Sequence, residues 1–445
     1  MYGKANSALA WLLAGSAFLT QSIVESKLVF AHYMVGTVDP NTKHAQQDID
    51  GAINVGFDAF ALNVGNPGAD WASNTVQQLF DYAETRPFKL FFSFDFYGNG
   101  DINQHQALFA RFKDHPAHLK YGSNNLPVVS SYSGGSIGPD AWRNFKTTNN
   151  VYLIPNPEAD GNYYSNPSRF FQSWGDAVDG VFSWETAWPD TSDTPVNVSS
   201  ARDEAVKAAA DAAGKTYVMG LSSLQYKHCC GDSWYRAGET NLPERMEQIL
   251  SVSPEFAEVI TWNDAGESHY IGPCWAEGLT PEILQYGNSD TMPHDGWQGV
   301  IGSFVDAFKA GAGAGAAMRP RNGRFAGALW HRGVLTSSSS SCGGDRPRGA
   351  GAAVDAVNYA VVLPAGSSSA GLRVRVTSGG RVLATRAVGA GLGYGSVAGM
   401  RPGPQKVELV DGAGNVVASA SGAVDVGAAP TDGFCNYNYY VAGLQ

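Results

Sequence analysis

The sequence contains few cysteines and few charged residues. Only 16% of its 445 residues are charged, and the five cysteines are Cys229, Cys230, Cys274, Cys342 and Cys435. Their spacing fits no zinc motif and no histidine cluster accompanies them, so we expect no metal site. We interpret the cysteines as structural and expect a disulfide between Cys342 and Cys435. One of the other three then stays unpaired within a monomer if all bonds are intramolecular.

Clusters of basic residues are also missing. The chain has 30 Lys and Arg against 41 Asp and Glu, which gives a net charge of −11. Because phosphate binding needs clustered Lys and Arg, this composition argues against a nucleic-acid partner. A neutral substrate fits the charge balance better than an anionic one.

The hydrophobic run near the N-terminus is too short to span a bilayer. Residues 8–19 are twelve uncharged, mostly apolar residues that follow Lys4. This pattern predicts a secretory signal peptide over residues 1–26, with small residues that allow cleavage between positions 17 and 26. An N-terminal helix packed on the fold is the alternative. We expect a secreted protein, extracellular or in the cell wall, without a membrane partner after cleavage.

Apolar, β-rich segments recur along the first part of the chain with helical spacers between them. The eight segments cover residues 27–35, 57–64, 89–97, 127–132, 150–155, 180–185, 216–221 and 258–264. Most are near-continuous apolar runs, which are typical of parallel strands covered on both faces. The alternation predicts a (β/α)₈ barrel over residues 27–315. An open doubly wound sheet is less favoured, because no glycine-rich phosphate motif follows the first strand.

The composition changes after about residue 300. Short alternating segments at 371–377, 381–385 and 406–410 are separated by glycine turns. This period-2 pattern predicts an antiparallel β-sandwich over residues 316–445. Tyr359 and Tyr394 are the only aromatic residues between Arg332 and Gly433. We therefore expect this region to support the barrel rather than to bind polysaccharide.

Polar and aromatic residues gather where the predicted strands end, which is the edge where such a barrel carries its active site. The densest group lies in residues 260–270, where Asp264 and Glu267 flank Gly266 at a strand end that bends into a loop. A loop cap is the alternative interpretation, because Asp and Glu beside Gly are common in turns. Indoles stack on sugar rings but also pack in cores. Asp264, Glu267 and Asp95 are the candidate catalytic residues, and the candidate substrate-binding residues are His32, Tyr33, Asn63, Tyr97, Tyr132, Trp184, Glu185, Trp262, Asn263, His269 and Tyr270.

Three blocks resemble glycoside hydrolase family 71, the fungal α-1,3-glucanases or mutanases. The blocks are Phe91-Phe-Ser-Phe-Asp95, Val181-Phe-Ser-Trp-Glu185 and Thr261-Trp-Asn-Asp-Ala-Gly-Glu-Ser-His-Tyr270. The resemblance covers residues 27–309 and, more loosely, the sandwich. It implies a (β/α)₈ barrel with a C-terminal β-sandwich, inverting hydrolysis and no cofactor. It places the key acids at Asp264 and Glu267 with a supporting Asp95, while Ala265 replaces a tyrosine that is common in the family.

The resemblance implies endo-acting hydrolysis of α-1,3-glucosidic bonds in cell-wall α-1,3-glucan by a secreted monomer. An endo-α-mannosidase-like hydrolase, as in glycoside hydrolase family 99, is one alternative. A non-catalytic glucan-binding protein is another, although the presence of all three acids argues against it.

Glycoside hydrolysis needs one protonated carboxyl and one ionised carboxylate. We expect Glu267 to be the acid because its longer side chain can reach the glycosidic oxygen, and Asp264 to be the base. Asp95 would hold the sugar or the water. An inverting pair stands about 6.5–9.5 Å apart, whereas a separation near 5 Å favours a retaining mechanism.

Overall fold

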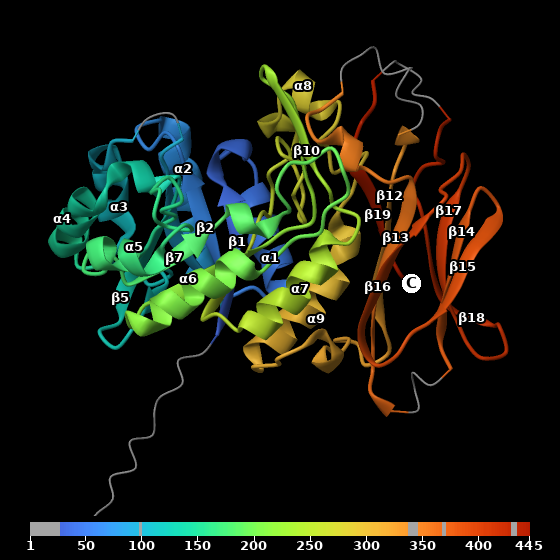
Figure 1. The fold of residues 1–445 in the computed structure, drawn as a ribbon. Coiled ribbons are helices and arrows are strands. Elements are labelled where there is room, and N and C mark those ends of the chain that lie inside the picture. Colours follow the sequence, from blue (N-terminus) through green and yellow to red (C-terminus); the bar gives the residue numbers. More distant parts are fainter. Residues whose placement is uncertain (1–26, 98–99, 337–345, 367–370, 429–433) are drawn as a thin grey trace, which may run out of the picture.

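The computed structural model describes residues 27–97, 100–336, 346–366, 371–428 and 434–445 of the chain. Figure 1 shows a curled sheet with surrounding helices, coloured blue to yellow, beside two orange-red sheets from the C-terminal part. The predicted signal peptide and Cys342 lie outside the described residues, so the cleavage site and the Cys342–Cys435 bond stay predictions. Within the described ranges, no helix is long and apolar enough to cross a membrane.

Each of the eight predicted segments overlaps a strand of one parallel sheet, but the last strand ends at Val259, so residues 260–264 of the predicted segment belong to a loop. Their bounds are β1 Leu28–Met34, β2 Ala59–Val64, β3 Lys89–Asp95, β5 Leu126–Tyr132, β6 Tyr152–Ile154, β7 Gly180–Ser183, β8 Thr216–Leu221 and β11 Phe256–Val259. The strand order is β6-β5-β3-β2-β1-β11-β8-β7, and the two-residue β4 (Lys120–Tyr121) pairs antiparallel with β5. The fold is therefore mixed α/β with a curled parallel sheet.

The two end strands of this sheet, β6 and β7, approach each other without forming a paired ladder. The amide of Asp179 donates to the carbonyl of Leu153 at 2.8 Å, and the amide of Phe182 donates to that of Pro155 at 3.0 Å. These contacts are single backbone hydrogen bonds between residues in or beside the two end strands.

Helices follow the strands and cover the outer face of the sheet (Figure 1). They are α1 His44–Val55, α2 Asp70–Ala83, α3 Gln106–Phe112, α4 Pro139–Asn149, α5 Pro167–Trp174, α6 Ala201–Ala212, α7 Asn241–Val252 and, after β11, α9 Gln298–Lys309. The short helix α8 (Pro281–Leu284) lies apart from this face, at the top of the view beside β10. Local sequence sets their ends. Helix α5 begins at Pro167. The preceding residue, Asn166, caps it, because its side chain accepts from the amide of Arg169. Helix α1 ends at Gly56, whose φ of 99° disfavours a side chain.

Alternation along each parallel strand divides the side chains between two cores. In β1, Phe30 packs with Phe91 and Phe256 inside the curled sheet. Its neighbours Val29 and Ala31 belong to the larger core under the helices. Because successive strand residues point to opposite faces, only every second residue at a strand end can face the interior of the ring.

A β-hairpin that the sequence did not predict follows β8. Strands β9 (Gln225–Cys229) and β10 (Asp232–Arg236) pair antiparallel in the register that places Lys227 opposite Trp234. The turn between them contains Cys230 and Gly231, both with positive φ. Cys229, Cys230 and Cys274 are free thiols.

The C-terminal part forms two four-stranded antiparallel sheets. One sheet has the order β16-β13-β12-β19 and the other β15-β14-β17-β18. Their bounds are β12 Ala326–Arg332, β13 Ala356–Leu363, β14 Arg373–Ser378, β15 Arg381–Ala387, β16 Gly391–Ala398, β17 Gln405–Val410, β18 Val416–Ser421 and β19 Tyr439–Gly443. Apolar side chains from both sheets, such as Leu329, Val361, Val376 and Leu409, share one core.

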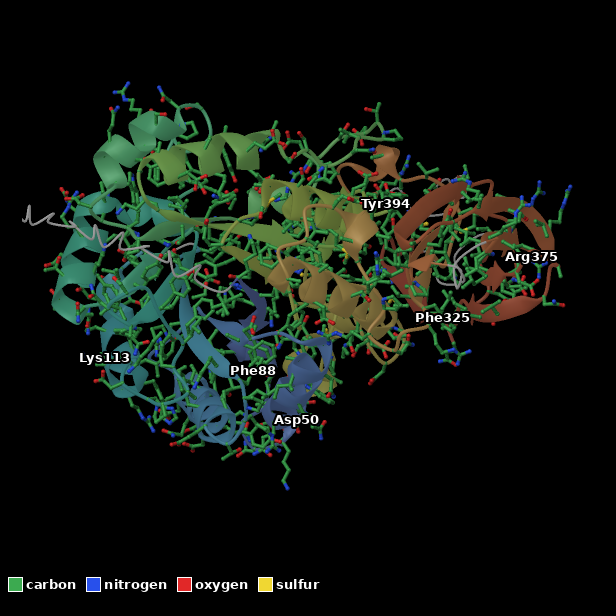
Figure 2. The ribbon with its side chains drawn as sticks, turned by 90° about the horizontal axis from the view of Figure 1, so that it is seen from below. Asp50, Phe88, Lys113, Phe325, Arg375 and Tyr394 are labelled. Atoms are coloured by element: carbon green, nitrogen blue, oxygen red, sulfur yellow. The ribbon has the colours of Figure 1, made fainter. Side chains whose placement is uncertain are left out.

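The first of these sheets also packs against the helices of the parallel sheet. Trp330 on β12 is fully buried, and its ring centroid lies 5.8 Å from that of Trp297, which precedes α9. Figure 2 shows Tyr394 of β16 near this junction and Arg375 of β14 at the outer end of the molecule. The sheet β16-β13-β12-β19 is therefore covered on both faces. The boundary that we predict at residues 315/316 stays a prediction.

Candidate active site

A cleft of about 390 Å³ opens at the carboxyl edge of the parallel strands. Eight of the sequence-predicted site residues line it: Asn63, Asp95, Tyr97, Tyr132, Trp184, Glu185, Asp264 and Glu267. The remaining lining residues are Met34, Thr191, Gln225, Lys227, Asp232, Trp234, Arg236 and Arg348. The cleft therefore brings together all three predicted acids.

The loop after β11 is fixed by its own backbone and side chains. The amide of Trp262 donates to the carbonyl of His32 at 2.8 Å, and that of Thr261 donates to the carbonyl of His269 at 2.9 Å. The hydroxyl of Thr261 accepts from the amide of Asp264 at 2.9 Å, and a carboxylate oxygen of Asp264 accepts from the amide of Glu267 at 3.0 Å. The two acids are thus held in one rigid turn.

Asp264, Glu267 and His269 form a compact group. One carboxylate oxygen of each acid and one imidazole nitrogen all lie within 4.8 Å of one another. His269 Nε2 is 3.2 Å from Glu267 Oε2 and 4.0 Å from Asp264 Oδ2. The side-chain amide of Gln225 donates to Glu267 Oε2 at 2.6 Å. Two donors therefore face Glu267.

The pKa values of the two acids are shifted in opposite directions. Burial raises the pKa of Asp264, and the negative charge of the adjacent Glu267 raises it further, against an opposing effect of His269. Burial also favours the neutral form of Glu267, but hydrogen bonds from His269 and Gln225 outweigh it and lower its pKa. The protonated form is therefore favoured at Asp264 and the ionised form at Glu267. These directions favour Asp264 over Glu267 as the acid, opposite to the choice from side-chain length, and the assignment of the two roles stays a prediction.

The distance between the two acids also differs from the expected one. Their nearest carboxylate oxygens lie within 4.8 Å, below the separation of about 6.5–9.5 Å that leaves room for a water molecule in an inverting pair. Both side chains leave the same short turn and face a common partner, His269. As a pair by themselves they have the closer spacing, near 5 Å, that favours a retaining mechanism, so an inverting reaction needs a third group.

The same three residues are the group that could hold a metal ion among the described residues. Hydrogen bonds already explain why these three side chains lie close together. Nε2 of His269 is hydrogen-bonded to Glu267, and Nδ1 of His269 lies 3.3 Å from Thr261 Oγ1. We assign no metal to this group.

Asp95 stands on another part of the rim. Strand β3, which carries it, is three strands away from β11 in the order β3-β2-β1-β11. One of its carboxylate oxygens accepts from the amide of Tyr97 at 2.8 Å. Tyr97 is 80% exposed beside it. Asp95 therefore faces the cleft from a different side than Asp264 and Glu267.

Trp184 and Glu185 continue the rim at the end of β7. The ring of Trp184 lies 4.8 Å from that of Tyr132. Glu185 forms an ion pair with Arg236 of the hairpin at 2.6 Å. The amides of Trp184 and Glu185 both donate to Glu158 Oε1 at 2.9 Å. Burial, with the charge of Glu185, raises the pKa of Glu158 to about 7.

Six predicted substrate-binding residues do not line the cleft. Tyr33 points outward and donates to Asp48, a carboxyl whose pKa burial raises to about 6. Trp262 is fully buried against Phe60, with ring centroids 5.6 Å apart. The hydroxyl of Tyr270 donates to the carbonyl of Met292 at 2.6 Å. These three side chains pack in the surrounding structure.

The other three act on the residues that line the cleft. His32 packs against Trp184 with ring centroids 4.8 Å apart, and its Nδ1 lies 2.7 Å from Glu258 Oε1. Asn263 accepts from the amide of Met34 at 2.8 Å. His269 holds Glu267. We therefore keep as proposed substrate-facing residues only the predicted ones that line the cleft.

Sequence reasoning missed the wall formed by the hairpin and Arg348. A short insertion between β8 and α7 carries five of the lining residues, and Arg348 comes from the C-terminal part. The available signal was the alternation of polar and aromatic residues on both sides of the Cys230-Gly231 turn.

The model of the family described as glycosyl hydrolase family 71 matches residues 25–445. A mutanase of Penicillium rubens is 32% identical over 430 residues, which cover 94% of this chain and 88% of that protein. A glucan endo-1,3-α-glucosidase of Schizosaccharomyces pombe is 32% identical over 298 residues, which cover 64% of this chain and 66% of that protein.

Among solved structures, an endo-α-mannosidase of family GH99 from Bacteroides thetaiotaomicron is similar with a TM-score of 0.50. The sequences are 13% identical, and the match covers 63% of this chain and 97% of that chain. At this identity the likeness concerns the fold.

Proposed function

The chain belongs to glycosyl hydrolase family 71, and from this membership we propose that it hydrolyses internal α-1,3-glucosidic bonds of α-1,3-glucan. It is a glycoside hydrolase. The observation that carries the proposal is the cleft that combines Asp95, Asp264 and Glu267 with the rings of Tyr97, Tyr132 and Trp184. Carboxyl groups supply the acid–base chemistry, and aromatic rings suit the C–H faces of sugars.

The proposed frame of this site is a closed (β/α)₈ barrel over residues 27–315, followed by a β-sandwich over 316–445. The backbone hydrogen bonds from Asp179 and Phe182 support closure between β6 and β7. The shared core of the two C-terminal sheets supports the sandwich. We further propose that the protein is a secreted monomer that acts on α-1,3-glucan of the fungal cell wall.

Asp264 is the proposed proton donor to the departing glycosidic oxygen. Burial and the adjacent charge of Glu267 raise the pKa of Asp264, which favours its protonated form. Glu267 also places a negative charge where the oxocarbenium-like transition state develops positive charge. His269 and Gln225 hold Glu267 in the ionised form.

Asp95 is the proposed base that activates water. An inverting reaction needs its base on the opposite face of the sugar from the acid, and Glu267 lies too close to Asp264 for a water between them. Asp95 lines the same cleft from a strand three positions away and has one carboxylate oxygen engaged by Tyr97. Glu185 is less suitable because Arg236 neutralises it at 2.6 Å. The product would then have the β configuration.

A substrate panel tests the function. Wild-type protein should release reducing sugar from insoluble α-1,3-glucan as oligosaccharides, because an endo-acting enzyme cuts within the chain. It should release none from α-mannan. The Asp264→Asn variant provides the control for contaminating activity. Release from α-mannan alone, or wild-type activity no higher than that of the control, would contradict the proposal.

A further inference from the structure

The hairpin β9–β10 presents two different faces because its residues alternate. Tyr226 and Tyr235 point to one side and are fully buried. Gln225, Lys227 and Trp234 point to the other side and line the cleft. Since a one-residue shift would exchange the two faces, the buried tyrosines fix which residues the cleft receives.

Residues of the C-terminal part hold the buried face. The hydroxyl groups of Tyr235 and Tyr439 lie 3.0 Å apart. The ring of Tyr437 packs against those of Tyr226 and Tyr235, with centroids 5.9 and 5.4 Å apart. The hairpin is thus clamped between the cleft and the C-terminal sheets.

The chain around Arg348 extends the hairpin at its outer edge. The amide of Tyr235 donates to the carbonyl of Arg348 at 2.8 Å, and the amide of Arg348 donates to the carbonyl of Ser233 at 3.1 Å. Gly349 follows with a φ of 85°, and a Cβ there would stand 2.3 Å from the carbonyl oxygen of Tyr235. This close approach brings the exposed Arg348 side chain to the cleft.

Trp234 is the large apolar surface of this wall. It is half-buried, and Lys227 Nζ lies 4.8 Å from the centroid of its ring, so the ammonium group covers one face of the indole. No carboxylate of the described residues forms an ion pair with Lys227 or Arg348. Their N–H groups can therefore donate to neutral hydroxyls.

The hairpin places Trp234 a short distance from the proposed catalytic acids. Gln225, at the base of the hairpin, donates to Glu267 at 2.6 Å. Trp234 lies opposite Lys227, which is two residues beyond Gln225 along the strand. At the usual rise per residue, Lys227 and Trp234 therefore lie about 7 Å along the hairpin from Gln225, a separation of roughly one sugar ring.

We propose that Trp234, Lys227 and Arg348 form a sugar-binding subsite beside the cleavage point, in which a glucose ring stacks on the open face of the indole. The inference rests on the proposed α-1,3-glucanase function. It gives the C-terminal part a direct role in substrate binding through Arg348, beyond the supporting role that its sequence suggested.

The test compares kcat/KM on soluble α-1,3-glucooligosaccharides of increasing length. Trp234→Ala should lower the ratio of long-chain to short-chain kcat/KM about tenfold, the effect of roughly one stacking contact. Trp234→Phe should preserve most of the ratio because it keeps an aromatic face. Arg348→Ala should lower the ratio in the same direction by a smaller factor.

The matched control is Trp71→Ala, because Trp71 is 39% exposed and does not line the cleft. This variant should keep the wild-type ratio. Thermal unfolding checks each variant, and Trp234→Leu, which keeps apolar bulk without a ring, replaces Trp234→Ala if the latter fails to fold.

Two negative results are distinguishable. If wild-type protein cleaves no α-1,3-glucooligosaccharide, the proposed function falls, and the subsite falls with it. If wild-type protein cleaves them but the Trp234 variants without a ring lose activity equally on long and short chains, the subsite alone is wrong. An unchanged ratio of long-chain to short-chain kcat/KM for Arg348→Ala would contradict a role of the C-terminal part in this subsite.

Discussion

At the scale of single residues, the acids of the 260–270 loop face different partners. Glu267 accepts hydrogen bonds from Gln225 and His269, whereas Asp264 accepts from the backbone amide of Glu267, and both side chains are half-buried. Hydrogen-bond donors stabilise the charged form of a carboxyl, and burial stabilises the neutral form. The environment of the two carboxyls, rather than the length of their side chains, therefore supports the proposed acid role of Asp264.

Substitution of the acids should separate their roles. Asp264→Asn should lower hydrolysis of α-1,3-glucan by at least about 100-fold, because the leaving oxygen loses its proton donor. The same variant should retain much activity on an α-1,3-glucooligosaccharyl fluoride, whose leaving group needs little protonation. Asp95→Asn should lose both activities. The account fails if Asp264→Asn loses both and Asp95→Asn keeps the fluoride activity.

The pH dependence of kcat/KM should depend on His269. In the proposed mechanism activity requires ionised Glu267, so kcat/KM should fall as the pH drops through the pKa of that group. His269 lowers this pKa, and His269→Asn should therefore raise it and move the acidic limb of the profile to higher pH. His118→Asn is the control, because His118 is buried away from the cleft between Phe112 and Val128. An acidic limb that does not move in His269→Asn would contradict this.

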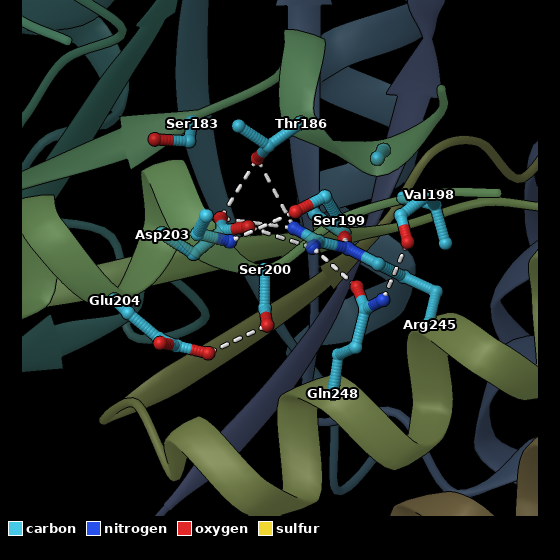
Figure 3. A network of polar contacts seen from close by, with 12 residues as sticks. Ser183, Thr186, Val198, Ser199, Ser200, Asp203, Glu204, Arg245 and Gln248 are labelled. Atoms are coloured by element: carbon cyan, nitrogen blue, oxygen red, sulfur yellow. Dashed lines mark hydrogen bonds and ion pairs between the residues drawn. The ribbon is translucent and has the colours of Figure 1, made fainter. Parts of the chain in front are cut away.

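At the scale of elements, a buried network fixes the segment that carries Trp184 and Glu185. Arg245 on α7 forms two hydrogen bonds with Asp203 on α6 at 2.7 and 2.9 Å (Figure 3). It also donates to Thr186 at 3.1 Å and to the carbonyl of Gly220 at 2.8 Å. Arg245 and Asp203 are fully buried. The side chain of Arg245 thus joins α7, α6, β8 and the segment that follows β7.

Removing this arginine should destabilise the fold strongly. Arg245→Met leaves Asp203 buried without its countercharge, and we expect a loss of about 3–5 kcal/mol in the free energy of unfolding. Urea denaturation measures it. The control is Arg143→Met on α4, where an exposed arginine pairs with Asp176 at 2.7 Å. The control should be far milder, and equal losses in the two variants would contradict the account.

The order of the strands and helices could be predicted from the sequence, whereas the orientation of single side chains could not. Continuous apolar runs predicted all eight parallel strands, because strands covered on both faces need apolar residues throughout. Consecutive strand residues such as His32 and Tyr33 point to opposite faces of the sheet. The sequence does not reveal which of the two faces the interior, because a continuous apolar run shows no difference between the two faces. The hairpin was missed because its mixed polar and aromatic residues resemble a loop until its buried partners, such as Tyr437 and Tyr439, are known.

At the scale of the whole molecule, the two parts of the chain depend on each other. Trp330 of β12 donates to the carbonyls of Gly238 and Glu239, which follow the hairpin. Arg332 forms a buried ion pair with Glu239 at 3.0 Å. The sheet β16-β13-β12-β19 therefore packs against both the α/β part of the chain and the second antiparallel sheet, and it supports the hairpin wall of the cleft.

A shortened chain should expose this dependence. A protein of residues 27–315 would leave Trp297 and the apolar side of α9 without the sheet that covers them. We expect it to aggregate or to unfold at a much lower temperature than residues 27–445, as size-exclusion chromatography and circular dichroism would show. A soluble monomer with an unchanged melting temperature would contradict the interdependence.

The central claim is that this cleft hydrolyses α-1,3-glucan with Asp264 as the acid and Asp95 as the base on the opposite face of the sugar. Proton NMR of the first products formed from a soluble α-1,3-glucooligosaccharide tests it most directly. The account predicts that the β-anomer of the new reducing end appears first and the α-anomer follows by mutarotation. An α-anomer formed first would contradict it and would favour a retaining mechanism by the close pair Asp264 and Glu267.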